Sequence, residues 1–355
     1  VYNDVISGLR AEGVVAPDIM RALQASASDG QSPMFAADFH WSAIGARAAA
    51  EEIGAAIKAD PAYAGLTPKT FESVEVGATV AFSGSRRAWQ GFCLDTLPRV
   101  ETPVWQTVEA GPAADGALDI GLGSDPAAEG GTLDIFADTA GAAGPDIVLV
   151  GTSFSDSEVN NFAGFLQQYS SLEVVNYAIT GGDQFGAISS YLTSPEFQKA
   201  PPRFLVWENP IYNNLGQFGP GQIEELIAAA STQCRIDLAA RVTGTDGLSA
   251  DLSPWVADGS VNRDTSILID FGSEGARAVD IELITASNIL RKTRIERGDR
   301  LRPTGRFYLD LGGFWMADLA GLTVRFDRDL PAAGETAPGL YLCPSPTSDH
   351  KEASQ

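Results

Sequence analysis

The chain has 355 residues, 44% of them hydrophobic and 9% aromatic, which is enough for one large or two medium domains with a buried core. Its 46 acidic and 24 basic residues give a formal net charge of −22, which argues against nucleic acid as a partner, because phosphates bind basic surfaces. No apolar run reaches the roughly 18 residues that a membrane-spanning helix needs. We therefore expect a globular protein that neither spans a membrane nor binds nucleic acid.

The first part of the chain divides into a helical and a β-rich segment. A helix is predicted over residues 42–58, because Ser42 is a suitable N-cap and apolar residues recur on one face behind it. Between about residues 67 and 144 the sequence changes to glycine, threonine and short alternating runs. This pattern favours an inserted β-rich lobe.

Strands and helices then alternate up to residue 230. Strands are predicted at 146–150, 172–179 and 203–208, and the first is a short apolar run typical of a strand buried on both faces. Helices are predicted at 184–197, at 222–230 and, after the first strand, along the stripe Val159, Phe162, Leu166 and Tyr169. This alternation indicates an α/β fold with a parallel sheet.

Beyond Cys234 the apolar period changes to two, which is typical of strands. The predicted strands are 266–271, 279–286, 306–311, 322–327 and 339–343. Short strands separated by Gly, Pro and Asp turns indicate a β-sandwich. We therefore expect an α/β domain over residues 1–231, a β-sandwich over 232–345 and a flexible tail over 346–355.

The chain contains three cysteines and two histidines without the spacing of zinc ligands, so neither a metal site nor a cofactor is predicted. Cys234 and Cys343 bracket the C-terminal third. A disulfide between them would stabilise the fold by about 4–5 kcal/mol in the chain-entropy model. Such a disulfide would also indicate an oxidising compartment. The alternative to a disulfide is that Cys234 and Cys343 are two ordinary buried thiols. Cys93 is left as the odd cysteine.

His40 is the candidate general base, because histidine titrates near neutral pH and the other histidine, His350, lies in the polar tail. It belongs to the segment Asp38-Phe39-His40-Trp41-Ser42, immediately before the predicted helix. In an extended backbone Asp38 and His40 lie on the same side, so the carboxylate could orient the imidazole. A structural histidine beside Trp41 is the alternative.

Ser153 is the candidate nucleophile, because it follows the apolar strand 146–150 at the sheet edge where open α/β folds place their sites. Its turn departs from the G-x-S-x-G pattern, since Ser155 replaces the second glycine. Gly182 ends the next strand, and its N–H is a candidate oxyanion donor beside that of Ser153. Ordinary tight turns are the alternative at both places.

Three segments also carry a family resemblance. They are FAADFHWSAIGARAAAEEI, which begins at Phe35, the stretch from Val148 to Leu192 with its Gly-Thr-Ser turn and NFAGFL helix, and RFLVWENP, which begins at Arg203. They resemble the Asp-x-His-Trp-Thr segment, the nucleophile segment and the following Trp-Glu strand of the AlgX/AlgJ alginate O-acetyltransferases. The resemblance covers roughly residues 1–230, and its motifs occur in the family's order.

The resemblance implies an SGNH hydrolase-like fold with a permuted order, in which the Asp-x-His pair precedes the serine. It assigns Asp38 as the residue that orients the imidazole, His40 as the general base and Ser153 as the nucleophile. The sequence departs from the family at Ser42, where threonine is usual, and we expect a further N-terminal strand segment of the family to be missing. The family layout also places a carbohydrate-binding β-sandwich after the catalytic domain.

Seven basic residues between positions 291 and 306 reverse the local charge of an acidic chain. Arginine forks suit the carboxylates of a uronate polymer. The candidate carbohydrate-binding residues are Arg294 and Arg302, with Trp255, Tyr308 and Trp315 as a stacking platform for sugar rings. A solvated strand edge protected by charge is the alternative.

Motifs and resemblance together predict an O-acetyltransferase that passes an acetyl group, through an acetyl-serine, to hydroxyls of an exopolysaccharide such as alginate. Its partners would be an anionic polysaccharide, an acetyl donor and other exopolysaccharide-assembly proteins, and its compartment would be the periplasm. Two alternatives stay open. The same triad could release acetyl groups to water as a polysaccharide esterase, or the protein could be a catalytically silent polysaccharide-binding scaffold.

Overall fold

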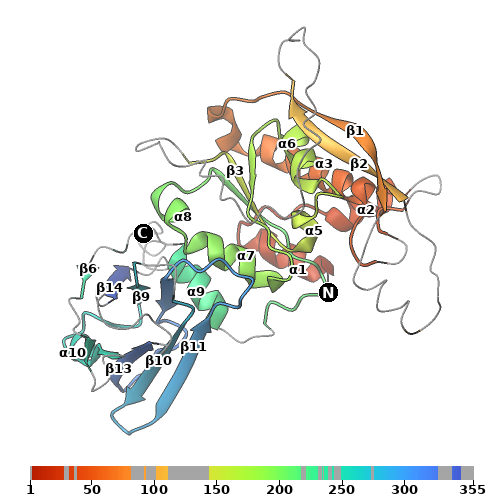
Figure 1. Cartoon of the computed structure of the whole chain (residues 1–355). Helices are drawn as coiled ribbons and strands as arrows, with labels where there is room; N and C mark the ends of the chain where they lie inside the picture. Colours follow the sequence, from red (N-terminus) through yellow and green to blue (C-terminus); the bar gives the residue numbers. More distant parts are fainter. Residues whose placement is uncertain are drawn as a thin grey trace. The chain divides into compact units, whose positions relative to one another are not determined.

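The computed structural model describes residues 2–27, 32–35, 38–80, 92, 101–110, 144–216, 221–230, 234, 236–238, 242–243, 249–272, 276–326 and 338–344. The chain forms two compact units (Figure 1). The first contains residues 1–148, 157–175 and 202–205, and the second contains 149–156, 176–201 and 206–355. Among the described residues, no helix has both the length and the apolar composition that crossing a membrane requires.

The first unit is built on the alanine-rich helix α3 (Ala43–Ala59), which confirms the helix predicted over 42–58. Helix α3 contacts α2 (Ile19–Ser26) and α6 (Phe162–Ser170). The same unit contains α1 (Tyr2–Ala11) and the short 3-10 helix η1 (Pro61–Gly65).

Small residues on α3 allow α6 to approach closely. Apart from Ile57, the buried residues of α3 are alanines and glycines, and a Cβ atom at Gly54 would lie 2.7 Å from the backbone of Tyr169 in α6. The helices therefore pack backbone against backbone at this point. Just before α3, Trp41 is 6% exposed and its ring centroid lies 4.7 Å from that of Phe162. Trp41 thus anchors the end of the segment that holds His40.

A long antiparallel ribbon of two strands, β1 (Phe71–Val80) and β2 (Glu101–Glu109), follows (Figure 1). It lies within the segment for which a β-rich lobe is predicted. The Arg47 guanidinium of α3 lies 4.2 Å above the ring of Trp105 in β2, which joins the ribbon to the helical part. Residues 81–91, 93–100 and 111–143, with Cys93 among them, lie outside the described residues.

Three strands form a sheet in the order β4 (Val174–Asn176), β3 (Ile147–Val150) and β5 (Phe204–Trp207). Hydrogen bonds run from Tyr177 N–H to Leu149 O and from Ile179 N–H to Gly151 O. On the other side they run from Phe204 N–H to Asp146 O and from Glu208 N–H to Val150 O. Because the partners advance in the same direction, all three strands are parallel, as predicted. The four side chains of β3 are fully buried.

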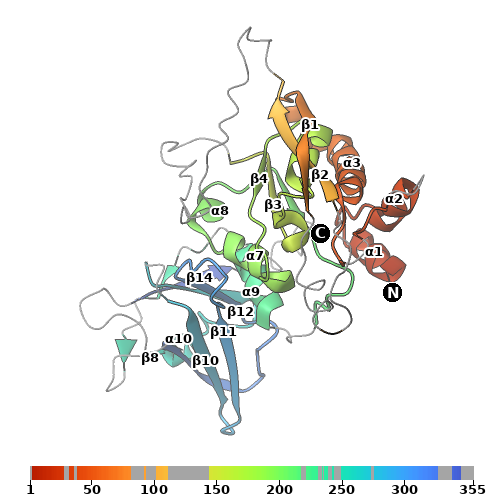
Figure 2. The ribbon, with the colours of Figure 1, turned by 45° about the vertical axis from the view of Figure 1, so that its right-hand side comes forward.

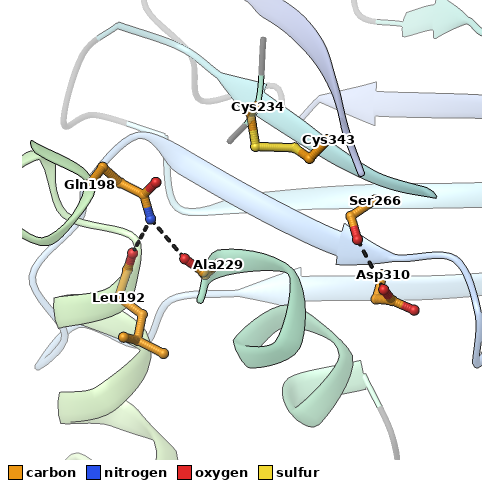
Figure 3. The surroundings of a disulfide bond; sticks show 7 residues. All are labelled: Leu192, Gln198, Ala229, Cys234, Ser266, Asp310 and Cys343. Carbon is orange, nitrogen blue, oxygen red and sulfur yellow. Dashed lines mark hydrogen bonds between the residues drawn. A yellow bond between two sulfur atoms is a disulfide. The ribbon is translucent and has the colours of Figure 1, made fainter. Parts of the chain in front are cut away.

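Before its sandwich, the second unit contains the helices α5 (Ser153–Asp156), α7 (Asp183–Leu192), α8 (Pro195–Lys199) and α9 (Gly221–Ala229). The single helix predicted over 184–197 is wrong, because Ser194 caps a new helix at Phe197 N–H and Pro195 occupies its first turn. The Gln198 amide then donates to the carbonyl groups of Leu192 and Ala229 (Figure 3). It therefore joins the C-terminal ends of α7 and α9.

The C-terminal part of the second unit is a β-sandwich, as predicted. One antiparallel sheet has the order β11-β10-β13-β8-β7 and the other has the order β12-β9-β14-β6. Side chains from both sheets share one core, which includes Ile267, Val279 and Leu322. Strands β10 and β11 form a long hairpin (Figure 2).

The elements of the sandwich have the following bounds: β6 Ile236–Asp237, β7 Val242–Thr243, β8 Ser249–Asp251, α10 Ser253–Ala257, β9 Thr265–Asp270, β10 Ala278–Thr285, β11 Leu290–Glu296, β12 Arg306–Asp310, β13 Leu319–Phe326 and β14 Gly339–Pro344. The five predicted strands correspond to β9, β10, β12, β13 and β14. Strand β11, which the sequence does not predict, carries part of the basic cluster.

A buried ion pair joins α9 to the sandwich. The Glu225 carboxylate accepts hydrogen bonds from both terminal nitrogens of Arg297, at 2.7 and 2.5 Å, and from the N–H of Tyr308 in β12. Glu225 and Arg297 are 1% and 4% exposed, so each compensates the other for the loss of water. Helix α9 thus packs on strand β12 of the sandwich, and the domain boundary between residues 231 and 232 stays a prediction.

The predicted disulfide between Cys234 and Cys343 is present (Figure 3). It connects residues 109 positions apart and attaches the segment before β6 to strand β14. Nearby, the Ser266 hydroxyl donates to the Asp310 carboxylate at 2.9 Å, between the neighbouring strands β9 and β12.

Removing the disulfide should lower the free energy of unfolding by about 4–5 kcal/mol, because the unfolded chain would no longer be closed into a long loop. Urea denaturation of Cys234→Ser and of the wild type would measure the difference. Cys93→Ser is the control, since it removes a cysteine outside the pair. A loss below about 1 kcal/mol would show that the crosslink contributes little in this chain.

Glu225→Ala should lower the free energy of unfolding by about 3–5 kcal/mol, because it leaves the Arg297 guanidinium buried without its partner. The double variant Glu225→Leu/Arg297→Met should recover most of that loss, since no charge stays buried. Denaturant titration of the wild type and both variants would test this. A double variant no more stable than the single one would contradict the interpretation.

Candidate active site

Asp38 and His40 lie in a tight loop of the first unit. An antiparallel bridge between Met34 and Trp41 closes the loop, together with a hydrogen bond from Phe35 N–H to His40 O. The Oδ1 atom of Asp38 accepts a hydrogen bond from the backbone N–H of His40 at 3.2 Å, and it lies 2.8 Å from His40 Nδ1. One carboxylate oxygen therefore holds both the backbone and the ring of His40.

This contact determines the tautomer of the imidazole. An ionised carboxylate only accepts hydrogen bonds, so Nδ1 carries a proton and Nε2 is the acceptor of the neutral ring. Only 20% of the His40 side chain and 11% of the Asp38 side chain are exposed. The predicted contact is present, but the expected extended backbone is wrong: the chain bends at Asp38, whose side chain closes an Asx turn on the His40 N–H.

Ser153 lies in the second unit as the first residue of α5, directly after β3 and its Gly151-Thr152 extension. The Asp156 N–H donates to Thr152 O at 3.0 Å, which closes the turn into the helix. The Asp156 carboxylate in turn accepts the N–H of Thr180, which follows β4. The serine is thus placed, as predicted, at the carboxyl end of a buried parallel strand.

Glu208 lies beside this turn and is a residue that the sequence analysis missed. Its Oε2 atom accepts hydrogen bonds from the Thr152 N–H at 2.7 Å, the Thr152 hydroxyl at 3.0 Å and the Ser155 hydroxyl at 3.1 Å. Burial raises the pKa of the Glu208 carboxyl, and these hydrogen bonds oppose the rise. The feature of the sequence that could have indicated Glu208 is its position directly after strand β5. Because β5 lies next to β3, Glu208 is at the edge of the sheet where Ser153 follows β3.

Gly182 lies between β4 and α7, where its N–H donates to Ile179 O at 3.1 Å. The N–H group of Gly182 thus closes a turn in this conformation, and its assignment as an oxyanion donor stays a prediction. The preceding Gly181 has a φ angle of +75°, a backbone conformation that residues other than glycine rarely adopt. The geometry supports the alternative, an ordinary tight turn.

Basic side chains line a cavity of about 620 Å³ in the second unit, formed by the starts of α7 and α9, by β11 and by the loop after it. The basic residues of its lining are Arg291, Lys292, Arg294, Arg297 and Arg300. Their charge is partly balanced, since Arg297 pairs with Glu225, and Arg294 pairs with Asp280 and Glu296 at 3.0 and 3.1 Å. Arg302 lies instead 4.9 Å above the ring of Tyr177.

Of the three aromatic residues predicted to stack on sugar rings, Tyr308 is buried. Tyr308 is 1% exposed, so its ring cannot stack on a sugar. Both faces of β12 are covered, because Phe307 and Leu309 enter the sandwich core and α9 packs on the strand. Trp255 and Trp315 are partly buried against the same core, and within the described part of the chain neither belongs to the cavity lining.

The structure thus brings Asp38 and His40 together in the first unit, and in the second it brings Glu208 to the turn that carries Ser153. Within the part of the chain that is described, no three His, Cys, Asp or Glu side chains gather in a way that could hold a metal ion.

A parallel sheet with a serine at the end of its fully buried strand, preceded in the chain by an Asp-x-His pair, is typical of a permuted SGNH hydrolase-like domain. The family model described as "SGNH hydrolase-like domain, acetyltransferase AlgX" matches residues 1–211. The chain belongs to this family.

Two relatives support the assignment to this family. The chain is 30% identical over 246 residues to the probable alginate O-acetylase AlgJ of Pseudomonas aeruginosa, which covers 66% of this chain and 59% of AlgJ. It is 27% identical over 325 residues to the alginate biosynthesis protein AlgX of Pseudomonas putida, which covers 87% of this chain and 62% of AlgX. The chain thus spans less than two thirds of either relative.

A solved structure of Pseudomonas aeruginosa AlgX matches this fold with a TM-score of 0.74 at 21% identity. The match covers 97% of this chain and 76% of that chain. At this identity the similarity supports the fold alone.

We expect neutral His40 to carry its proton on Nδ1, because Asp38 Oδ1 accepts from that nitrogen. Nitrogen NMR of histidine-labelled protein, above the pH at which the ring titrates, would report the tautomer. With two histidines in the chain, a His350→Gln variant identifies the His40 signals. Asp38→Asn should move His40 toward the Nε2–H tautomer. A wild type that is already Nε2–H would contradict the assigned hydrogen bond.

Proposed function

We propose that this protein is an O-acetyltransferase that transfers acetyl groups to hydroxyls of an exopolysaccharide, either alginate or a related uronate polymer. The observation that carries the proposal is the Asp38–His40 pair, an oriented general base in a chain of the AlgX acetyltransferase family. The names of the relatives AlgJ and AlgX supply alginate as the acceptor.

In the proposed reaction Ser153, His40 and Asp38 act as a triad. His40 Nε2 takes the proton of the Ser153 hydroxyl while the serine oxygen attacks the carbonyl carbon of the acetyl donor. The bond to the leaving group breaks, and the leaving group receives that proton from His40. An acetyl-serine remains.

The second half of the reaction repeats these steps with a sugar hydroxyl. The hydroxyl gives its proton to His40 and attacks the acetyl carbon, after which Ser153 leaves and takes the proton back. The sugar then carries the acetyl ester and the enzyme is restored. Throughout, Asp38 holds the Nδ1–H in place and stabilises the imidazolium that forms in each half.

The basic cavity of the second unit is the proposed acceptor site. Uronate carboxylates pair with guanidinium forks, and the cavity contributes Arg291, Arg294 and Arg300. The loop that carries Arg300 reaches the turn after β4, where Arg300 Nη1 lies 3.5 Å from Thr180 O. Trp255 and Trp315 stay candidates for sugar stacking, and Arg302 stays a candidate for carboxylate binding.

A periplasmic location belongs to the same proposal. It is supported by the Cys234–Cys343 disulfide, because structural disulfides persist in oxidising compartments. Other proteins of exopolysaccharide assembly would then be the partners that deliver the acetyl donor and the polymer.

Mass spectrometry of uronate oligomers incubated with an artificial acetyl donor would test the function. Wild type should acetylate the oligomers, and Ser153→Ala should lower the rate at least about 1000-fold, because the acetyl-serine cannot form. Ser287→Ala, which removes an exposed hydroxyl of the sandwich, should retain the rate.

Other outcomes would contradict the proposal. Donor consumption that depends on Ser153 but leaves the oligomers bare would indicate the esterase. No consumption and no transfer, with oligomers still bound, would indicate the binding scaffold.

A further inference from the structure

We infer that Glu208 is a positioning residue for the nucleophile, whose buried carboxylate fixes the turn that carries Ser153. The inference rests on the proposed role of Ser153 and adds a group outside the triad. The bonds described above join Glu208 to the turn that carries Ser153. Glu208 acts through Thr152 and Ser155, which lie before and after Ser153 in this turn.

The carboxylate holds the nucleophile turn at both ends. On one side it accepts the N–H and the hydroxyl of Thr152, the residue immediately before Ser153, and on the other side it accepts the hydroxyl of Ser155. All three bonds converge on the single atom Oε2. The residues before and after Ser153 are thereby tied to one carboxylate at the end of β5, Thr152 through its backbone and hydroxyl and Ser155 through its hydroxyl.

The packing around Gly151 shows how closely the carboxylate fits against the turn. A Cβ atom at Gly151 would lie 2.6 Å from Glu208 Oε2 and 2.9 Å from Ser155 Oγ. A side chain at this position would therefore displace the carboxylate or the hydroxyl that it binds. The glycine of the Gly-Thr-Ser turn is explained by this contact with Glu208, without any positive φ angle.

The turn is held from the other neighbouring strand as well. The Asn176 amide, at the end of β4, donates to Ser155 O at 2.8 Å, and the Thr180 N–H donates to the Asp156 carboxylate at 2.9 Å. These bonds reach residues after Ser153. The carboxylate of Glu208 also reaches the residue before it, so its removal frees the side of the turn that enters from β3.

The chemistry of the position calls for an acceptor without a donor. An ionised carboxylate accepts from all three groups, whereas a glutamine amide accepts through its oxygen but turns an NH2 group toward the remaining donors. Alanine leaves the Thr152 N–H and both hydroxyls without this partner. We therefore expect a graded effect, in which glutamine retains part of what alanine loses.

Steady-state hydrolysis of 4-nitrophenyl acetate by the full chain would test the inference. For Glu208→Ala we expect kcat to fall about 100-fold while KM stays within about threefold, because a misplaced nucleophile binds donor normally but attacks it slowly. Glu208→Gln should recover at least about tenfold of that loss. A sulfonyl fluoride that labels Ser153 would give the active fraction of each preparation, so that rates refer to folded molecules.

Asp310→Asn is the matched control. Asp310 is also a buried carboxylate that accepts from a serine hydroxyl, Ser266, and from a backbone N–H, Gly312, but it belongs to the sandwich. It should lower the melting temperature and leave kcat per labelled molecule unchanged. A purely structural role of Glu208 predicts the same pattern for Glu208→Ala, and that result would overturn the inference.

Two further outcomes decide the remaining cases. If Glu208→Ala does not fold, Glu208→Gln decides alone: a lower kcat at unchanged melting temperature supports positioning, and an unchanged kcat overturns it. If the wild type shows neither hydrolysis nor acetyl transfer that depends on Ser153, the proposed function fails and the positioning role fails with it. Failure of positioning alone is recognised by wild-type turnover with normal Glu208 variants.

Discussion

A carboxylate that is buried away from water needs hydrogen-bond donors from the protein to replace the water molecules. This constraint fixes several contacts between elements of the fold. Glu208 takes its donors from the nucleophile turn, Glu225 from Arg297 and the N–H of Tyr308, and Asp310 from Ser266 and Gly312. Each carboxylate meets groups outside its own helix or strand. These side chains therefore determine how one element ends against another, which backbone pairing alone does not specify.

The loop of His40 combines the same constraint with packing. Trp41 is buried against Phe162, while Phe39, two positions earlier, is 48% exposed with its ring centroid 4.3 Å from that of His40. The imidazole thus lies between an anchored residue and a solvent-facing one. Asp38 fixes its orientation from within the same short segment. The close approach of α3 and α6 supplies the rigid base on which this loop is built.

Local features of the sequence predict the structure best. The Asp38–His40 contact joins residues two positions apart, and the strands with strong apolar patterns, β3, β9 and β10, are found where predicted. Strand β11 is missed because its alternating charged residues face solvent and only Ile295 is buried, so no apolar period marks it. The break between α7 and α8 depends on Ser194 and Pro195, whose capping signal the apolar pattern conceals.

Long-range features could not be read in the same way. The role of Glu208 requires that the strand containing it lies beside β3, and the burial of Tyr308 requires that α9 covers β12. In each case the residue type was visible, whereas its partner came from another element. The disulfide pair is the exception, because three cysteines leave few choices.

The position of the disulfide has a consequence for the biosynthesis of the chain. Cys93 and Cys234 both precede Cys343 in the chain, so they are synthesised before the native partner of Cys234 exists. The native bond also lies on β14, the strand that pairs with both β6 and β9. The native disulfide can therefore form only after β14 has been made. Formation of this crosslink marks a finished module, and premature oxidation would trap an unfinished one.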